Sequence, residues 1–492
     1  MQPPDAFTNL WPHGISEDCL TLNVYRPHNA NASRASAVEP SSADTAALPV
    51  MLFFYGGSYV EGTSSFIIYE ASEWVSHAAA SPDPVIVVTA NYRLNAFGYL
   101  GADALRDVTA RNATGNYGLE DQRAAMRWVR DNARAFGGDP ARVTIFGESA
   151  GAGSVSMHLV APRSKGLFSG AIAQSGPLAA RWVYQRWDEA AALFADLVRG
   201  LGCGGPSNAA DVAQCLRGKD AVSVLAATAA AAANHSGHAG GVVKMAPTVD
   251  GVEFDAAPMA LVARGAWNRV PLVLGTNLNE GTILVSPFPQ NATAAQYGAW
   301  VRATMAAAYG ARNGSAVADA VLQKYYPVAD FATPFAAAAE VFTDFAMSCP
   351  ARATARALSG GSNGSSDPAI FLYHFVHAPA LVKLLEPALG CFHGSELAFV
   401  FDKRITLLGG AERALAAQFS ALWSGFAARR APTAAGDGVQ WPRYATSSDL
   451  SLRIDAGSAR AANLTVVRGL KKRRCDWWAS LGPAPSVKAA VV

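Results

Sequence analysis

The chain has 492 residues, of which 51% are hydrophobic and only 16% are charged, so it can bury a large core. Its 40 basic and 38 acidic residues leave a net charge of +2, and this balance argues against nucleic acid as a partner. The basic run at 471–474 is expected to be a solvated helix end. No run reaches the roughly 18 apolar residues of a membrane helix, so we expect no transmembrane segment.

The first predicted elements are two strands separated by a flexible insert. Residues 19–25 (CLTLNVY) and 50–55 (VMLFFY) have the branched and aromatic content of strands. The stretch 28–48 between them is rich in Asn, Ala, Ser and Pro and lacks periodicity, which indicates a long surface loop. A similar insert, rich in Gly and Ser, is expected near 359–368.

Strands and helices then alternate along the rest of the chain. Four apolar runs are expected to be buried strands, at 85–89, 143–146, 270–274 and 370–375. Amphipathic helices are expected at 122–132 and 181–199, and a helical stretch at 154–159, whereas the alanine-rich run 226–233 is uninformative. This alternation predicts an α/β architecture with one central sheet.

The strongest chemical signal is the pentapeptide GESAG at 147–151, between the predicted strand 143–146 and the helical stretch after it. A strand, sharp turn and helix of this kind hold the Ser149 hydroxyl clear of the sheet, and the flanking glycines leave room for it. The positive end of the following helix also lies near the place where an oxyanion would develop.

A second glycine-rich turn, YGGSY at 55–59, follows the predicted strand that ends near Phe54. Backbone N–H groups in such a turn can stabilise the negative charge that ester hydrolysis places on the carbonyl oxygen, by about 3 to 4 kcal/mol per donor. A plain β-turn is the alternative interpretation.

These segments resemble the type-B carboxylesterase/lipase family, which includes the cholinesterases. The resemblance is carried by EDCLTLNV at 17–24, by the glycine turn and by FGGDPARVTIFGESAG at 136–151, with shorter matches such as QSG at 174–176. It spans roughly Trp11 to Trp478 and implies one α/β-hydrolase domain over residues 1–492, with a mostly parallel twisted sheet flanked by helices. The family's N-terminal strands have no counterpart, so we expect either a natural start further upstream or a member that has lost them.

A serine hydroxyl is a weak nucleophile, so a histidine must accept its proton and a carboxylate must orient that histidine. In this fold the acid precedes the histidine, each after a later strand. Glu280, in GTNLNEG at 275–281, matches the family's acid-bearing segment, whereas the rival Asp250 is typical of a turn residue that caps its own backbone.

Among nine histidines, His393 in GCFHGSEL at 390–397 resembles the family's histidine loop. His374 and His377 fall within or just after a strand, and His158 is expected to pack behind the nucleophile. The resemblance also implies that the backbone N–H groups of Gly57, Ser58 and Ala150 stabilise the oxyanion. Ser58 stands at a place where the family often has Gly or Ala.

The family pattern implies two disulfides, Cys203 with Cys215 and Cys349 with Cys475. Cys19 has no upstream partner, and Cys391 is expected to be a free thiol; as a rival nucleophile it lacks the strand-turn-helix context of Ser149. Residues 1–5 do not resemble a signal peptide, yet seven N-x-S/T sequons favour the secretory pathway, at Asn31, Asn112, Asn234, Asn291, Asn313, Asn363 and Asn463.

No metal-ligand cluster, Walker loop or dinucleotide fingerprint occurs, so we expect no cofactor and a small-molecule ester as substrate. The sequence therefore predicts a secreted serine hydrolase that cleaves carboxylic esters through a Ser-His-Glu triad and an acyl-enzyme. Three alternatives remain. The first is a cholinesterase, because Trp11 lies near the place of the family's cation-binding tryptophan, although its spacing from Cys19 is shorter than in that pattern. The second is a lipase, which needs an apolar lid that the sequence does not reveal. The third is a non-catalytic adhesion or binding protein.

Overall fold

The structure is a computed structural model, and it describes residues 16–28, 47–108, 112–204, 208–235, 245–285, 288–360, 367–432 and 440–482. Most of the two predicted inserts, 28–48 and 359–368, lies outside the described residues, and so does Trp11. Among the described helices, none combines the length and the apolar character that a bilayer crossing requires.

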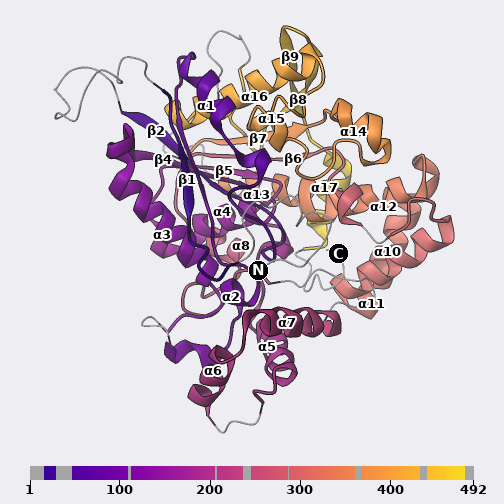
Figure 1. Ribbon diagram of the computed structural model, residues 1–492. Helices are drawn as coiled ribbons and strands as arrows, with labels where there is room; N and C mark the ends of the chain where they lie inside the picture. Colours follow the sequence, from indigo (N-terminus) through magenta and orange to yellow (C-terminus); the bar gives the residue numbers. More distant parts are fainter. Residues whose placement is uncertain are drawn as a thin grey trace.

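One nine-stranded sheet runs through the molecule in the order β1-β3-β2-β4-β5-β6-β7-β8-β9 (Figure 1). The outermost pairs β1–β3 and β8–β9 are antiparallel, and all other neighbours are parallel, as the alternating sequence pattern predicts. The carboxyl ends of the parallel strands therefore meet at one edge. The strands are β1 Leu22–Tyr25, β2 Leu48–Phe54, β3 Ile86–Ala90, β4 Gly138–Glu148, β5 Gly170–Gln174, β6 Leu272–Asn277, β7 Ile370–Phe375, β8 Leu450–Ser458 and β9 Ala461–Arg468.

Helices cover both faces of this sheet. Helices α1 and α16 pack on one face, and α3, α4, α8 and α13 lie on the other (Figure 1). The described α-helices are α1 Ser72–Ala79, α2 Asn95–Tyr99, α3 Tyr117–Asn132, α4 Ala150–Val160, α5 Trp187–Gly200, α6 Ala209–Arg217, α7 Ala221–His235, α8 Pro258–Ala263, α9 Gly281–Leu284, α10 Ala294–Tyr309, α11 Ala311–Ala320, α12 Pro334–Phe342, α13 Cys349–Leu358, α14 Ala380–Leu385, α15 Leu397–Val400, α16 Gly410–Arg429 and α17 Lys472–Ser480.

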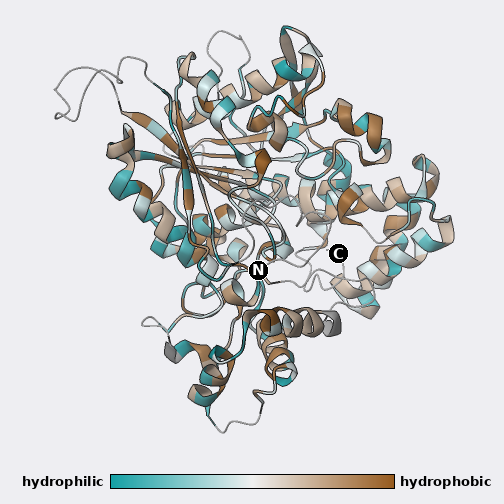
Figure 2. Ribbon diagram, in the orientation of Figure 1, coloured by the Kyte–Doolittle hydropathy of each residue, from teal (hydrophilic) through white to brown (hydrophobic). Residues whose placement is uncertain are grey.

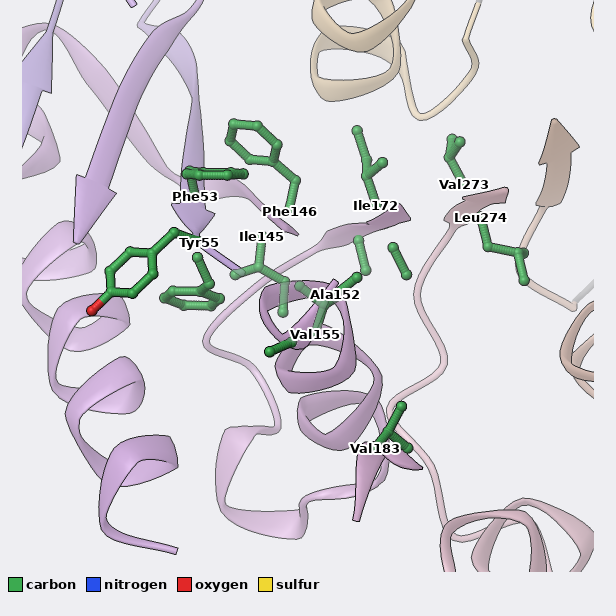
Figure 3. Packing of buried hydrophobic residues seen from close by; sticks show 14 of the residues in the cluster. Phe53, Tyr55, Ile145, Phe146, Ala152, Val155, Ile172, Val183, Val273 and Leu274 are labelled. Atoms are coloured by element: carbon green, nitrogen blue, oxygen red, sulfur yellow. The ribbon is translucent and has the colours of Figure 1, made fainter. Parts of the chain in front are cut away.

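The central strands are apolar on both faces because helices cover both (Figure 2). Alternation along each strand divides the core into two layers. Phe53 and Phe146 pack against each other on one face, with ring centroids 4.9 Å apart and ring planes tilted by 49°, and Phe53 also contacts Phe401 edge-on. Figure 3 shows Ala152 and Val155 of α4 on the other side of these strands. The sheet and α4 thus form one rigid base for the loops at the carboxyl edge.

One local expectation of secondary structure differs from the structure, and several elements were not foreseen. The helix expected at 181–199 begins only at Trp187, because Arg186 and Glu189 form a capping box, and Arg181–Val183 is a separate 3-10 turn. The uninformative alanine run forms part of α7, and strands β5, β8 and β9 were not predicted. β5 escapes a search for branched residues because its sequence, GAIAQ, is mostly small side chains.

The expectation of a solvated helix end at 471–474 is wrong for two of its four residues. Lys471 lies 2.6 Å from Asp344, whose side chain is fully buried, and Arg474 lies 2.7 Å from Glu340. Lys472 and Arg473 between them are exposed. Sequence alone did not reveal the acidic partners because they lie more than a hundred residues away, on α12 and the π-helical turn Thr343–Ser348 that follows it.

Two disulfides join Cys203 to Cys215 and Cys349 to Cys475, the pairs that the family resemblance implies. Replacing Cys349 and Cys475 together by serine is expected to lower the free energy of unfolding by about 2 to 5 kcal/mol. The bond joins residues 126 positions apart and holds α17 against α13, so its loss releases a long loop in the unfolded chain.

Urea unfolding followed by circular dichroism measures this loss. The matched control is Cys19→Ser, which removes a half-buried free thiol and should leave the unfolding midpoint nearly unchanged. Equal stability of the double variant and the wild type would contradict a structural role for the bond.

Candidate active site

The carboxyl edge of the sheet brings together the side chains that the sequence singled out. The glycine turn follows β2, Ser149 follows β4, Glu280 follows β6, and His393 lies in the segment after β7. These four strands are consecutive in space apart from β5, which lies between β4 and β6. Residues more than 330 positions apart therefore meet because their strands are neighbours and parallel.

Ser149 occupies a strained turn between β4 and α4. Its backbone angles, φ 56° and ψ −126°, fall outside the regions that L-residues favour. The flanking glycines explain how the turn fits. A Cβ added at Gly151 would lie 1.9 Å from the carbonyl oxygen of Phe54, and one added at Gly147 would lie 2.5 Å from the carbonyl carbon of Gly151. The pentapeptide is thus dictated by close backbone packing.

The glycine turn after β2 packs directly against this serine. A Cβ added at Gly56 would lie 2.8 Å from the Cβ of Ser149. Ser58 and Tyr59 have positive φ angles of 55° and 63°, so the chain doubles back there at a conformational cost.

The three N–H groups expected to act as oxyanion donors are free. Among the described residues, the backbone N–H groups of Gly57, Ser58 and Ala150 donate to no acceptor. Backbone N–H groups that no other protein atom engages, close to a strained serine, are the kind of donors that an oxyanion site requires.

Glu280 and His393 form a short buried pair. Glu280 is 0% exposed, and its Oε2 accepts a hydrogen bond of 2.6 Å from Nδ1 of His393. Its other oxygen accepts from the hydroxyl of Ser175 at 2.5 Å and from the backbone N–H of Asn277 at 2.6 Å. Three donors hold the carboxylate in one orientation, and the imidazole follows it.

The loops that carry these two side chains are also tied to each other. The N–H of Asn279 donates to the carbonyl oxygen of Cys391 at 2.9 Å, and the N–H of Cys391 donates to Oδ1 of Asn279 at 3.0 Å. Gly390 makes this approach possible, because its φ is 60° and a Cβ there would lie 2.5 Å from Oδ1 of Asn279. The acid and the histidine are therefore held by main-chain contacts as well as by their own bond.

The other ring nitrogen of His393 faces Glu148. Nε2 lies 3.2 Å from Oε1 of Glu148, and no hydrogen bond joins Nε2 to the hydroxyl of Ser149 in this structure. Hydrogen bonds of this kind often tighten only when substrate is bound. Burial raises the pKa of Glu148 to about 8, against the lowering effect of His393. Burial alone lowers the pKa of His393, but the carboxylates of Glu148 and Glu280 more than offset it, and the net shift is upward.

Replacing Glu148 by glutamine is expected to move the acid limb of the kcat/KM profile to lower pH by about one unit. His393 accepts a proton only when it is neutral, so a raised pKa confines activity to higher pH. Removing the charge of Glu148 lowers that pKa, and neutral histidine persists at lower pH. Hydrolysis of p-nitrophenyl acetate between about pH 5 and pH 10 measures the limb. A limb that stays in place or moves upward would contradict the assigned contact.

Sequence reasoning missed a chain of buried polar groups beneath the site. The indole of Trp423 donates to Gln174, whose amide donates to Glu396 at 3.1 Å. Asn277 also donates to Glu396 and, at 2.9 Å, to the carbonyl oxygen of Phe392, next to His393. Burial raises the pKa of Glu396. The QSG match at 174–176, which includes Ser175, was the available signal, but nothing in the sequence assigned it a contact.

The other histidines, the thiol and the acid that the sequence offered for the site make structural contacts instead. Nδ1 and Nε2 of His158 lie within 2.9 Å of Ser164 and Gln122, and burial lowers the pKa of this histidine. Burial lowers the pKa of His374 to about 3, and His377 pairs with Glu412.

Burial raises the pKa of the Cys391 thiol, which donates to a carbonyl oxygen and is a poor nucleophile. One oxygen of Asp250 accepts three backbone N–H groups of its own turn, as expected.

Comparison with known proteins identifies the family of the chain. The model of the carboxylesterase family matches residues 1–478. The chain is 31% identical over 449 residues to an acetylcholinesterase of Leptinotarsa decemlineata, covering 87% of this chain and 67% of that protein. It is 30% identical over 528 residues to an acetylcholinesterase of Electrophorus electricus, covering 97% and 76%. A third acetylcholinesterase, from Danio rerio, is 29% identical over 508 residues, covering 94% and 74%.

The chain therefore belongs to the carboxylesterase family, and the family resemblance drawn from its motifs is confirmed. Its sheet and helices are those of an α/β-hydrolase. Family and relatives together support an ester-hydrolysing serine hydrolase.

Proposed function

We propose that the chain hydrolyses carboxylic esters through a triad of Ser149, His393 and Glu280 and a covalent acyl-enzyme. One observation carries the proposal. The buried His393–Glu280 hydrogen bond of 2.6 Å lies at the same sheet edge as the strained serine, beside three N–H groups without acceptors. A nucleophile, a base oriented by a carboxylate and an oxyanion site are the parts that acyl transfer requires.

In the first half-reaction, Nε2 of His393 takes the proton of the Ser149 hydroxyl while Oγ bonds to the ester carbonyl carbon. The carbonyl electron pair moves to oxygen, and the N–H groups of Gly57, Ser58 and Ala150 stabilise that oxyanion. The carbonyl re-forms, the bond to the alcohol oxygen breaks, and His393 gives its proton to that oxygen. The alcohol leaves and an acyl-serine remains.

In the second half-reaction, water replaces the alcohol. His393 takes a proton from water as the oxygen attacks the acyl carbon, and the same N–H groups bind the second oxyanion. The bond to Oγ then breaks, the serine regains the proton, and the carboxylic acid departs. Glu280 orients the imidazole and stabilises the imidazolium in both halves.

Trapping the acyl-enzyme tests this proposal. The protein is mixed with p-nitrophenyl butyrate, quenched in acid within the first turnovers and measured by intact mass. A mass increase of one butyryl group, absent from Ser149→Ala, supports the triad. A folded wild type that neither gains the group nor releases p-nitrophenol would contradict it, and a non-catalytic binding role would replace it.

A second candidate is hydrolysis of choline esters, which the names of the three relatives favour. A cation site needs aromatic faces near the serine, and the one tryptophan that the sequence offered for it, Trp11, lies outside the described residues. Comparing kcat/KM for acetylthiocholine with that for the neutral ester phenyl thioacetate decides between the two. A choline-ester hydrolase prefers the cation by at least about tenfold, whereas a general esterase does not.

We also propose that the protein passes through the secretory pathway. Its two disulfides persist in oxidising compartments, and four of its seven sequons lie on exposed residues, at Asn112, Asn291, Asn313 and Asn463. Asn31 and Asn363 lie outside the described residues, and Asn234 falls within α7. Protein expressed through a eukaryotic secretory route should therefore gain electrophoretic mobility after treatment with an N-glycosidase. Unchanged mobility would contradict the glycan sites.

A further inference from the structure

Glu280 is anchored through the peptide groups on both sides of it. The N–H of Asn279, which precedes it, donates to the carbonyl oxygen of Cys391 in the histidine loop. The N–H of Gly281, which follows it, donates to Oγ1 of Thr343 at 2.9 Å. Gly281 is the first residue of the four-residue helix α9, so its N–H has no partner within that helix and needs an acceptor from elsewhere. Thr343 therefore supplies the second of the two anchors.

Thr343 can serve as an anchor because its own hydroxyl is fixed. The side chain is buried, and the hydroxyl donates at 2.7 Å to the carbonyl oxygen of Ala339, four residues earlier on α12. Because its proton is committed there, Oγ1 presents acceptor lone pairs to Gly281. The two segments are also in direct contact, since a Cβ added at Gly281 would lie 2.1 Å from the carbonyl oxygen of Ala339. The hydroxyl and the glycine thus hold the segment after β6 against the carboxyl end of α12.

The turn that carries this threonine is itself held from two other directions. It is the π-helical turn Thr343–Ser348 that follows α12, and such turns occur frequently at functional sites. Asp344, the next residue of the turn, is fully buried and pairs with Lys471 at 2.6 Å. The carbonyl oxygen of Ala346 accepts a hydrogen bond of 3.1 Å from the indole of Trp182. The acceptor for the acid-bearing segment is therefore presented from a support that is fixed at two further points.

We propose that Thr343 is a positioning residue for ester hydrolysis, whose hydroxyl holds the peptide after Glu280, and with it the carboxylate, in the orientation that His393 requires. This inference rests on the proposed triad and adds to it a residue from another part of the chain. Thr343 acts through Glu280 and not on the ester, because it keeps the hydrogen bond of 2.6 Å between the acid and Nδ1 of His393 aligned. Even small displacements of a catalytic group slow a reaction that depends on aligned geometry.

Thr343→Val tests this proposal, because valine keeps the branched shape and removes only the hydroxyl. The N–H of Gly281 then loses its acceptor, and the peptide after Glu280 is free to shift. We expect kcat for p-nitrophenyl acetate to fall about 10- to 100-fold, while KM stays within about twofold. Thr343→Ser keeps the hydroxyl and should retain more than about half of the wild-type kcat.

The matched control is Thr228→Val in α7. Thr228 is also buried, and its hydroxyl also donates at 2.7 Å to a carbonyl oxygen four residues earlier, that of Val224. Among the described residues, however, it accepts no N–H from the segments that carry the triad. The two valine variants should therefore lose similar stability in thermal unfolding, and only Thr343→Val should lose kcat.

A pH series separates positioning from a merely structural effect. Burial lowers the pKa of His393, and three carboxylates that face it raise that pKa, those of Glu148, Glu280 and Glu396. A carboxylate of Glu280 that is no longer held in place raises the pKa less, so neutral histidine persists at lower pH. The acid limb of kcat/KM should therefore move to lower pH in Thr343→Val and stay in place in the control.

A loss of kcat together with the shifted limb, which Thr343→Ser restores, supports the proposal. A loss of kcat without the shift, or one that Thr228→Val shares, assigns a structural role and overturns it. If Thr343→Val does not fold, Thr343→Ser and Thr343→Ala are compared, since they differ by the hydroxyl alone, and equal kcat in the two overturns the proposal. Glu280→Gln distinguishes the failures: if it loses activity while Thr343→Val keeps it, only the positioning role falls, whereas full activity of Glu280→Gln overturns the triad itself.

Discussion

Ser149→Ala is expected to lower kcat for p-nitrophenyl butyrate by on the order of 10⁴- to 10⁶-fold, with little change in stability. The methyl group cannot bond to the ester carbon, so only the oxyanion donors and substrate binding remain to accelerate the reaction. The strained turn itself persists, because close packing around Gly147 and Gly151 dictates it and not the hydroxyl. Steady-state rates with p-nitrophenyl butyrate and thermal unfolding of both proteins check these two expectations together.

The matched control for this variant is Ser156→Ala on the same helix. Ser156 is also buried, and its hydroxyl donates to the carbonyl oxygen of Gly176 at 2.7 Å. Its loss is expected to cost about 1 to 2 kcal/mol of stability and less than about tenfold in kcat. A Ser149→Ala protein that keeps more than about a tenth of wild-type activity would place the nucleophile elsewhere.

Glu280→Gln is expected to lower kcat for the same ester by on the order of 10³- to 10⁴-fold. The amide has nearly the shape of the carboxylate but has no charge to stabilise the imidazolium, and it can present a donor to Nδ1 of His393. The hydroxyl of Ser175 and the N–H of Asn277 still hold the side chain, so the backbone of the site should stay in place. Rates across a pH series, together with unfolding midpoints, separate this electrostatic loss from misfolding.

A second buried histidine–glutamate pair supplies the control. His377, just after β7, lies 2.8 Å from Glu412 of α16, and Glu412 also accepts the N–H of Ala380 and of Leu408. Glu412→Gln should therefore lower stability about as much as Glu280→Gln does, while kcat for the soluble ester stays within about tenfold. Equal losses of kcat in the two variants would show that any buried carboxylate matters and would contradict a specific role for Glu280.

Much of this site could be predicted because its parts depend on local sequence. The turn at Ser149 needs Gly147 and Gly151 on either side, so the pentapeptide alone is enough to predict it. Glu280 follows the end of β6 at Asn277 by three residues, so a recognised strand places it at the right edge of the sheet. His393 lies well beyond the end of β7 at Phe375, and its own peptide, GCFHGSEL, singled it out. Oδ1 of Asp250 accepts the N–H groups of its own turn, and this could be predicted from the local peptide, whereas the bond from the N–H of Thr114 to Oδ2 could not.

The contacts that could not be predicted are those between distant segments. Glu148 and His393 are 245 positions apart in the sequence, and they face each other only because β4 and the loop after β7 meet at one edge of the sheet. Trp423 of α16 donates to Gln174 of β5, and Lys471 pairs with Glu340 of α12 and Asp344 of the turn beyond it. Whether Leu384 and Leu385 are exposed depends on whether distant segments of the chain pack over them, and no local pattern distinguishes them from core leucines.

Covalent labelling with a fluorophosphonate tests the central claim most directly. The probe reacts with a serine only when a base removes its proton and an oxyanion site receives the phosphoryl oxygen, so it reports the whole arrangement at once. Peptide mass spectrometry should find the adduct on Ser149 in wild-type protein, and labelling should fail in Ser149→Ala and slow strongly in Glu280→Gln. A folded, glycosylated protein that stays unlabelled, or an adduct on any other residue, would contradict the assignment of Ser149 as the nucleophile.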